Sequence, residues 1–170
     1  MPKLLIVDDE LGSRESLRLI FKSDYEVRLA ASAAEALALV ARETVDVVLL
    51  DVILPGQSGV DVLRQLQASF PGLPVIMVSA STSIPPVVEA IRLGALDFVS
   101  KPFDVESLRH TVRRALETGR LHRRVEVLES EVSRAFPTQA IVGRSPVFVA
   151  ALEQLRKAAA TDASVLIQGE

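Results

Sequence analysis

Five residues of this chain are of types that could together handle a phosphoryl group, although they are far apart in the sequence. They are Asp8, Asp9, Asp51, Ser79 and Lys101. Two carboxylates about 4–5 Å apart repel by about 3–4 kcal/mol at an effective dielectric constant near 20, so three gathered carboxylates need a cation. An all-oxygen site favours Mg²⁺ or Mn²⁺. A cation, a hydroxyl and an ammonium around one carboxylate suit a phosphoryl group on that carboxylate.

Alternating strand and helix patterns in residues 1–104 determine where these side chains lie. Short apolar segments rich in β-branched residues predict strands at 4–7, 27–30, 45–50, 75–78 and 96–99. The third and fourth lack a polar–apolar alternation, as strands buried on both faces do. Helical faces are predicted between the strands: Leu17, Ile20 and Phe21, then Leu63, Leu66 and Phe70, then Val88, Ile91 and Ala95. The pattern predicts an α/β fold, a flavodoxin-like, doubly wound, five-stranded parallel sheet in the order 2-1-3-4-5.

That strand order brings the polar residues to one edge of the sheet. Strands one and three flank the point where the order reverses, and ligands bind there at the carboxyl ends of the strands. Asp8 and Asp9 follow the first strand, Asp51 the third, Ser79 the fourth and Lys101 the fifth. Each residue alone has an ordinary interpretation, since an Asp after a strand is often a helix cap and Lys-Pro is often a turn. Together they predict a site.

Local signals mark the helix ends. Ser32 with Glu35 predicts a capping box that opens a helix through Glu43. Asp104 is a predicted N-cap for the last helix of the sheet domain. In that helix Val105, Leu108 and Val112 are expected to face the sheet.

Composition excludes several classes of protein. The 170 residues are 49% hydrophobic and 24% charged, which supports a buried core and argues against disorder. The absence of cysteine excludes disulfides, thiolate metal sites and a cysteine nucleophile. No apolar run approaches the roughly 18 residues of a membrane span and no signal peptide is evident, so we expect a cytoplasmic protein without membrane contact.

Charge changes sign near residue 105. Residues 1–104 carry 14 acidic and 9 basic residues, whereas residues 105–170 carry 8 acidic and 10 basic ones, within a net charge of −3. An evenly basic nucleic-acid binder would not show this division.

The last helix is predicted to continue well past the sheet. Residues 105–135 contain no proline and only one glycine, Gly119, which costs about 1 kcal/mol in a helix. A helix of that length would span roughly 46 Å. Leu121, Val125, Leu128 and Val132 are spaced 4, 3 and 4 apart, as in a coiled-coil seam, and predict a homodimer through this helix. A solvated connector is the alternative. The arginines of the helix lack the accompanying pattern of a DNA-binding surface.

A second unit is predicted after Phe136-Pro137. It comprises Ile141 to Pro146, a helix through about Ala159, and a strand from Ser164 to Ile167. The chain then reads Gln168-Gly169-Glu170, without the full G-x-x-x-x-G-K-[ST] signature of a phosphate-binding loop.

The set Asp8-Asp9, Asp51, Ser79 and Lys101-Pro102 resembles the signature of two-component response-regulator receiver domains. Pro55-Gly56 and Gly59 match the loop after the phosphorylation site of that family. The resemblance covers roughly residues 1–118. It implies that Asp51 accepts a phosphoryl group from the phosphohistidine of a sensor histidine kinase.

The resemblance also implies roles for the neighbouring residues. Asp9 and Asp51 would bind Mg²⁺ directly, the backbone carbonyl of Ile53 would complete the protein ligands, and Asp8 would act largely through water. Ser79 and Phe98 would form the switch pair, and Lys101 would neutralise the phosphoryl oxygens. The Lys101–Pro102 bond would be cis. Many family members have Tyr where this chain has Phe98, so the switch here would act by packing alone.

The tail resembles the start of the AAA+ ATPase domain of NtrC-type, sigma-54-dependent transcription activators, on residues 141–146, 152–157 and 164–170. The resemblance implies three parts: a receiver over 1–118, a helical linker over 119–136 and the edge of an ATPase domain over 137–170. The chain would then be a regulatory phospho-acceptor without ATPase or DNA-binding activity. The full-length protein would contact sigma-54 RNA polymerase and DNA.

Residues of this chain bear on three alternative functions. A phosphatase with an aspartyl-phosphate intermediate should carry a second Asp two residues after the nucleophile, where this chain has Ile53. A flavin-binding module should lack the acidic trio. A stand-alone receiver that acts only through protein contacts remains the alternative, and residues 119–170 argue against it.

Overall fold

The computed structural model describes the chain except residues 81–83, 136–144, 160, 162–163 and 167–170. The chain divides into two compact units, Met1–Glu126 and Val127–Glu170. The boundary falls within a single long helix, α5 (Val105–Ala135). We describe each unit by itself.

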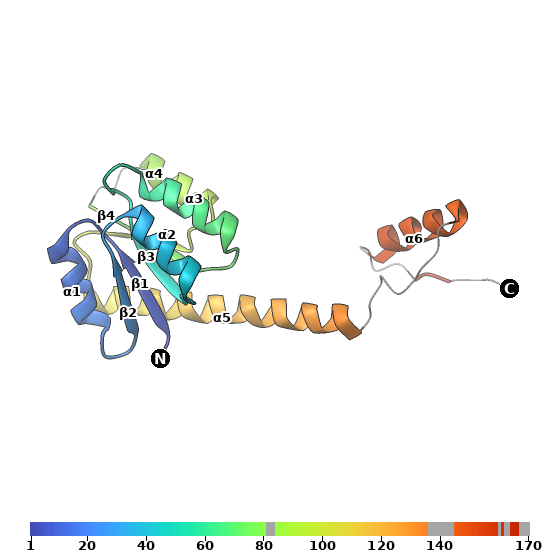
Figure 1. Ribbon diagram of the computed structural model, residues 1–170, viewed down its shortest axis with the longest axis horizontal. Coiled ribbons are helices and arrows are strands. Elements are labelled where there is room, and N and C mark those ends of the chain that lie inside the picture. The colour runs from blue at the N-terminus through green and yellow to red at the C-terminus, as the bar shows by residue number, and fades with distance from the viewer. Residues whose placement is uncertain (81–83, 136–144, 160, 162–163, 167–170) are drawn as a thin grey trace. The chain divides into compact units, whose positions relative to one another are not determined.

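A five-stranded parallel sheet forms the centre of the first unit (Figure 1). Its strands are β1 (Lys3–Val7), β2 (Glu26–Ala30), β3 (Val47–Asp51), β4 (Val75–Ser79) and β5 (Asp97–Ser100). The strand order is β2-β1-β3-β4-β5 and every neighbouring pair is parallel. The predicted doubly wound sheet is confirmed, with strand bounds within two residues of those expected.

Helices cover both faces of the sheet, and each face has its own hydrophobic core. Helices α2 (Ala33–Arg42), α3 (Gly59–Ser69) and α4 (Ile84–Arg92) pack on one face. Helix α1 (Leu11–Phe21) and the first turns of α5 pack on the other. Side chains of β3 and β4 are buried throughout, which explains why these strands lack a polar–apolar alternation.

Two predicted helix caps are present. The Glu35 amide donates to the Ser32 hydroxyl at 3.3 Å, so Ser32 caps α2 as predicted. The Glu35 carboxylate accepts from the Ala31 amide at 2.7 Å, one residue before the Ser32 amide that a standard capping box uses. The Asp104 carboxylate accepts from the Ser107 amide at 2.8 Å and caps α5.

Two predicted helix faces are wrong in part. On α4, Val88 and Ile91 are exposed, whereas Ala90 is buried, as is the predicted Ala95 just after the helix. On α5, Leu108 and Val112 are buried but Val105, in the first turn, is exposed. Apolar spacing alone does not distinguish a core-facing stripe from an apolar surface when the helix is short or begins away from the sheet.

Gly119 has a packing role that its helix propensity did not indicate. A Cβ atom at this position would lie 2.6 Å from Cγ and 3.0 Å from Cδ of Pro74. Helix α5 therefore passes the loop before β4 at a distance that only glycine permits. Beyond this contact, Arg123 donates to Asp46 at 2.7 Å. The first unit accordingly includes α5 as far as Glu126.

The second unit contains α6 (Pro146–Ala159), as predicted. The predicted strand is wrong over Ser164 to Leu166, which form no strand, while Ile167 lies outside the described residues. A strand needs a neighbouring strand for its backbone hydrogen bonds, and the described part of this unit has none. The predicted residues 141–144, Phe136-Pro137 and 168–170 also lie outside the described residues. Among the described helices, none is both long and apolar enough to span a membrane.

Candidate functional site

Polar side chains from four strands gather at the carboxyl edge of the sheet. Asp8 follows β1, Asp51 ends β3, Ser79 ends β4 and Lys101 follows β5. Asp8, Asp51 and Ser79 are 2%, 7% and 1% exposed, and they are the buried polar residues of the described chain. Burial of two carboxylates in one place is unfavourable unless a positive charge compensates them.

Lys101 supplies that charge. Its Nζ atom donates to Oδ2 of Asp8 at 2.7 Å and to Oδ2 of Asp51 at 2.6 Å. One ammonium group thereby joins Lys101 to Asp8, 93 positions away in the sequence, and to Asp51, 50 positions away. Burial alone would lower the pKa of Lys101, but its hydrogen bonds to Asp51 and Asp8 outweigh burial and raise the pKa. Lys101 is thus held in its charged form.

Asp8 is enclosed by donors. Its Oδ2 atom also accepts from the Ser13 hydroxyl at 2.6 Å, and Oδ1 accepts from the Glu10 amide at 2.9 Å. Burial would raise the pKa of Asp8, whereas the hydrogen bonds from Lys101, Ser13 and Glu10 lower it. The hydrogen bonds outweigh burial, so the pKa of Asp8 lies below its ordinary value. The Asp8 carboxylate is therefore ionised and accepts three hydrogen bonds.

Asp51 is positioned by its own loop. Oδ1 accepts from the Ile53 amide at 2.8 Å, which leaves Oδ2 directed to Lys101. Gly59, at the start of α3, lies directly against this backbone, because a Cβ there would sit 1.9 Å from the carbonyl oxygen of Asp51. The Gly59 amide donates to the Val52 carbonyl at 2.8 Å and closes the loop. The sequence-predicted Gly59 is thus a requirement of the Asp51 geometry.

The two predicted switch residues occupy different environments. Ser79 is buried at the end of β4, beside the site, and its carbonyl accepts from the Lys101 amide at 2.7 Å. Phe98 is half-buried on β5, opposite Met77 of β4, and packs against the core on the α2–α4 face. The Lys101–Pro102 peptide bond is cis, as the resemblance implied.

The predicted metal ligands are only partly gathered. Asp8 and Asp51 meet at Lys101, whereas Asp9 is exposed. Within the described residues, no three carboxylate or imidazole groups are placed to hold a metal ion together. The donor types of Asp8, Asp9, Asp51 and the Ile53 carbonyl, all hard oxygens, do suit Mg²⁺. In this arrangement Lys101 holds two of the carboxylates that the metal would use.

Two residues of the site were not predicted from the sequence. Ser13 bonds the Asp8 carboxylate, and Arg14 donates to the Asp8 carbonyl at 2.5 Å. Both lie in the first turn of α1, the helix that directly follows Asp8 and Asp9. Their position in the sequence could have predicted this role. Polar side chains in the first turn of a helix that starts at the site can reach the end of the preceding strand.

Comparison with known families identifies the first unit. Residues 4–113 match the family model described as the response regulator receiver domain. The chain belongs to this family. The matched range contains Asp8, Asp9, Asp51, Ser79 and Lys101, and the predicted resemblance is confirmed.

Curated relatives align along almost the whole chain. The alginate biosynthesis transcriptional regulatory protein AlgB of Pseudomonas putida is 37% identical over 169 residues, covering 99% of this chain. The regulatory protein AtoC of Escherichia coli is 34% identical over 169 residues, again covering 99% of this chain. The chain spans only 37% of the length of either relative. These relatives are longer proteins named as regulators, and the alignment covers just over a third of each.

Solved structures agree with the receiver fold. The structure of NtrX from Brucella abortus in complex with ADP superposes with a TM-score of 0.74 at 35% identity, covering 92% of this chain and 33% of NtrX. The CheY-like receiver domain protein of Methanospirillum hungatei superposes with a TM-score of 0.69 at 29% identity, covering 72% of this chain and 98% of that protein. The receiver domain is a signalling domain of two-component systems.

Proposed function

We propose that this receiver domain is a phospho-acceptor in which Asp51 receives a phosphoryl group from a sensor histidine kinase. One observation carries the proposal: a buried carboxylate lies 2.6 Å from an ammonium group at the switch point of the sheet. Such a carboxylate can act as a nucleophile, and the ammonium can neutralise charge on a group attached to it.

The chemical step is a direct displacement. A carboxylate oxygen of Asp51 attacks the phosphorus of the donor phosphohistidine, an O–P bond forms, and the N–P bond breaks. The imidazole of the kinase leaves and takes up a proton. Lys101 Nζ then faces the phosphoryl oxygens, and the Ser79 hydroxyl at the end of the adjacent strand donates a hydrogen bond to them.

Mg²⁺ would be held by Asp9, Asp51 and the Ile53 carbonyl, with Asp8 acting mainly through water, and Mn²⁺ could replace it. When bound, the metal withdraws negative charge from the phosphoryl group that is being transferred. Asp51 accepts one hydrogen bond on each oxygen, so its carboxylate has acceptor sites left for a metal ion beside Lys101.

The proposed response to phosphorylation is a structural change that begins at Ser79 and extends to α5. Ser79 would move toward the phosphoryl group, and Phe98 would follow it inward by packing, since it has no hydroxyl group to donate. The surface of α4, β5 and α5 changes as a result. Leu121, Val125 and Leu128 on α5 are 66%, 52% and 51% exposed, and the side chain of Val132, the fourth predicted seam residue, lies outside the described part of the chain. We propose that these residues form a homodimer seam whose geometry depends on phosphorylation.

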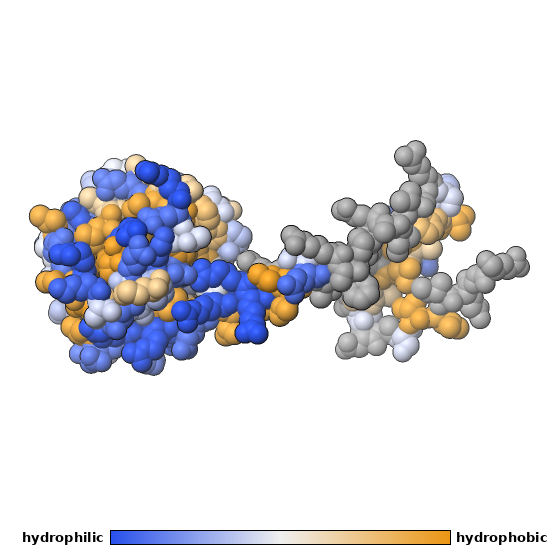
Figure 2. All heavy atoms as spheres, turned by 60° about the horizontal axis from the view of Figure 1, so that its bottom comes forward, coloured by the Kyte–Doolittle hydropathy of each residue, from blue (hydrophilic) through white to orange (hydrophobic). Residues whose placement is uncertain are grey.

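Figure 2 shows apolar side chains among hydrophilic ones along the exposed part of α5.

The proposed output is control of an attached sigma-54-dependent ATPase, with polymerase and DNA contacted by the full-length protein. Relatives that align with 99% of the chain and are named transcriptional regulators support this output over that of a stand-alone receiver. The proposed location is the cytoplasm, in agreement with the kinase partner.

The test is intact mass after incubation with acetyl phosphate, with and without Mg²⁺, on the wild type and on Asp51→Asn. The expected result is a gain of one phosphoryl group that requires Mg²⁺ and is absent in Asp51→Asn. A folded wild type that gains no mass would overturn the proposal.

A further inference from the structure

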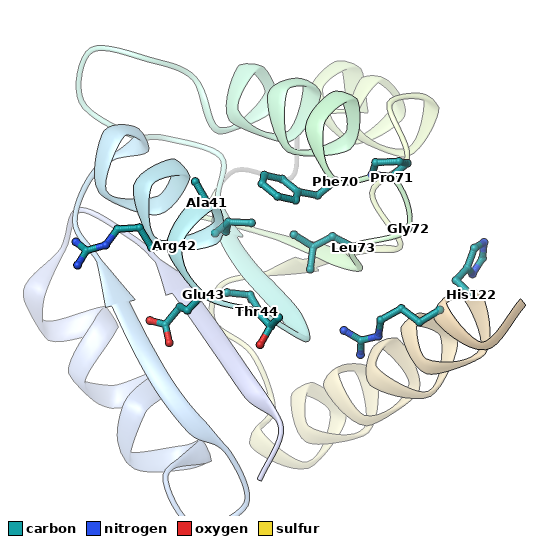
Figure 3. A pocket seen from close by; sticks show the side chains of 12 residues that line it. Ala41, Arg42, Glu43, Thr44, Phe70, Pro71, Gly72, Leu73 and His122 are labelled. Carbon is teal, nitrogen blue, oxygen red and sulfur yellow. The ribbon is translucent and has the colours of Figure 1, made fainter. Parts of the chain in front are cut away.

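A pocket of about 420 Å³ lies at the amino end of the sheet, opposite the Asp51 edge (Figure 3). Residues 40–45, at the end of α2, form one wall, and residues 70–73, between α3 and β4, form another. His122 and Arg123 of α5 form the third wall. All three walls belong to the first unit. The volume falls within the usual range of small-molecule sites.

Interactions outside the pocket hold each wall in place. Glu43 accepts from Lys3 and from Arg28, both at 2.9 Å, and anchors the end of α2 to β1 and β2. Gln67 Nε2 donates to the Leu73 carbonyl at 3.0 Å and fixes the 70–73 loop. The Gly119–Pro74 contact and the Arg123–Asp46 ion pair fix α5. The pocket is therefore preformed.

The interior is apolar and offers no unpaired formal charge. Val40 and Val45 are buried at its base, and Figure 3 shows the side chains of Phe70 and Leu73 directed into the space between α2 and α5. Arg42 and Glu43 point away from it in the same view. Arg123 is paired with Asp46, as Glu43 is with Lys3 and Arg28.

Hydrogen-bonding groups lie on opposite walls of the pocket. The Thr44 hydroxyl is on the wall that follows α2, and the His122 ring is on α5. A charged ligand would lose solvation without gaining an opposite charge, whereas an apolar body with one hydrogen-bonding group would match both parts of the pocket.

We propose that this pocket binds a small uncharged ligand, an aromatic ring system or short acyl chain that carries one hydrogen-bonding head group. Because α5 forms one wall, an occupant contacts α2, the 70–73 loop and the helix that leads out of the receiver domain. Ligand binding therefore holds α5 against the base of the sheet. The site is separate from the phosphoryl site and does not depend on it.

The experiment is titration of the full ¹⁵N-labelled chain with 1-octanol, octanoate and octylammonium, followed by amide chemical shifts. The three probes share an apolar chain and differ in charge. With 1-octanol we expect saturable shifts centred on residues 40–45, 70–73 and 119–124, and weaker binding of both charged probes. Amide hydrogen exchange in 119–124 should slow at saturation.

A matched pair of variants locates the site. Ala41 is exposed and lines the pocket, so Ala41→Trp should fill it and weaken 1-octanol binding by about tenfold or more. Ala38→Trp, exposed on the same helix but outside the pocket, should leave binding unchanged.

Three results would overturn the proposal. One is the absence of saturable shifts, or shifts that do not centre on the pocket. Another is tighter binding of a charged probe than of 1-octanol. A third is concentration-dependent shifts of residues 40–45 and 70–73 without any probe. These residues lie off the proposed α5 seam, so such shifts would show that a second copy of the chain covers the pocket.

Discussion

At the scale of single residues, the site is a set of buried charges that compensate one another. Asp8 and Asp51 are both buried, and Lys101 is the ammonium group that touches both. Without that ammonium, two desolvated carboxylates would face each other at close range. Lys101 therefore stabilises the receiver fold as well as serving the proposed phosphoryl chemistry.

Replacing Lys101 tests this double role. Lys101→Met should lower the free energy of unfolding at pH 7 by about 2 kcal/mol, since two charge-assisted hydrogen bonds are lost and the carboxylates stay buried. Adding Asp51→Asn to that variant should recover part of the loss, because one of the two repelling charges is removed. Urea unfolding measures both effects.

The control is Lys22→Met, an exposed lysine after α1, which should change stability by less than about 0.5 kcal/mol. If Lys101→Met were as stable as the wild type, the carboxylates would not depend on this ammonium.

At the scale of elements, ion pairs join α2 to the first two strands. Glu43 accepts hydrogen bonds from Arg28 and Lys3, and these lower the pKa of Glu43 to about 2 from an ordinary value of 4.5. A carboxyl with a lowered pKa in the folded state contributes stability above its unfolded pKa. That contribution is lost as pH falls from 4.5 toward 2.

The corresponding prediction concerns acid unfolding. Glu43→Gln should reduce stability at pH 7 and lessen the fall in stability between pH 4.5 and 2, measured by urea unfolding at a series of pH values. Glu117→Gln, at an exposed position on α5, is the control and should leave the pH dependence unchanged. Parallel curves for the wild type and Glu43→Gln would show that the ion pairs contribute no pH-dependent stability.

Two glycines in helices give opposite predictions. Gly119→Ala places a Cβ 2.6 Å from the Pro74 ring and should destabilise the chain by about 1–2 kcal/mol, despite the better helix propensity of alanine. Gly12→Ala, in α1, meets nothing within 4 Å and should stabilise it by about 0.5–1 kcal/mol. Thermal and urea unfolding compare the two, and equal effects would contradict the close approach of α5 to Pro74.

Some of these features could be predicted from the sequence, and others could not. Strand order and the meeting of Asp8, Asp51 and Lys101 followed from strand ends, because topology alone brings carboxyl ends together. The contact of Gly119 with Pro74 could not be read, since it depends on the path of α5 across the sheet. The exposed Val88 and Ile91 were misplaced because a nine-residue helix gives too few turns to define its buried face.

At the scale of the whole molecule, α5 links the receiver domain to the rest of the chain. It is one continuous helix of 31 residues, and Leu121, Val125, Val127 and Leu128 are exposed in the single chain. Exposed apolar residues at coiled-coil spacing are expected to find a partner helix.

The proposed homodimer can be tested with adjacent residues. Leu128→Lys should weaken self-association by about tenfold or more in sedimentation experiments, because each copy loses a buried leucine. Val127→Lys changes a residue of similar exposure that lies off the seam, and it should have little effect. Equal dimerisation of wild type and Leu128→Lys would count against this seam.

The central claim is that Asp51, and not another carboxylate of the cluster, carries the phosphoryl group. Asp8 accepts three hydrogen bonds, from Lys101, Ser13 and the Glu10 amide, whereas Asp51 accepts two, from Lys101 and the Ile53 amide. Asp9 is exposed. The most direct measurement is borohydride reduction of the acetyl-phosphate-treated protein, followed by peptide mass mapping, because reduction converts an aspartyl phosphate to homoserine. The account predicts homoserine at position 51 alone. Homoserine at position 8 or 9, or a reduction-resistant phosphate on Ser79, would contradict it.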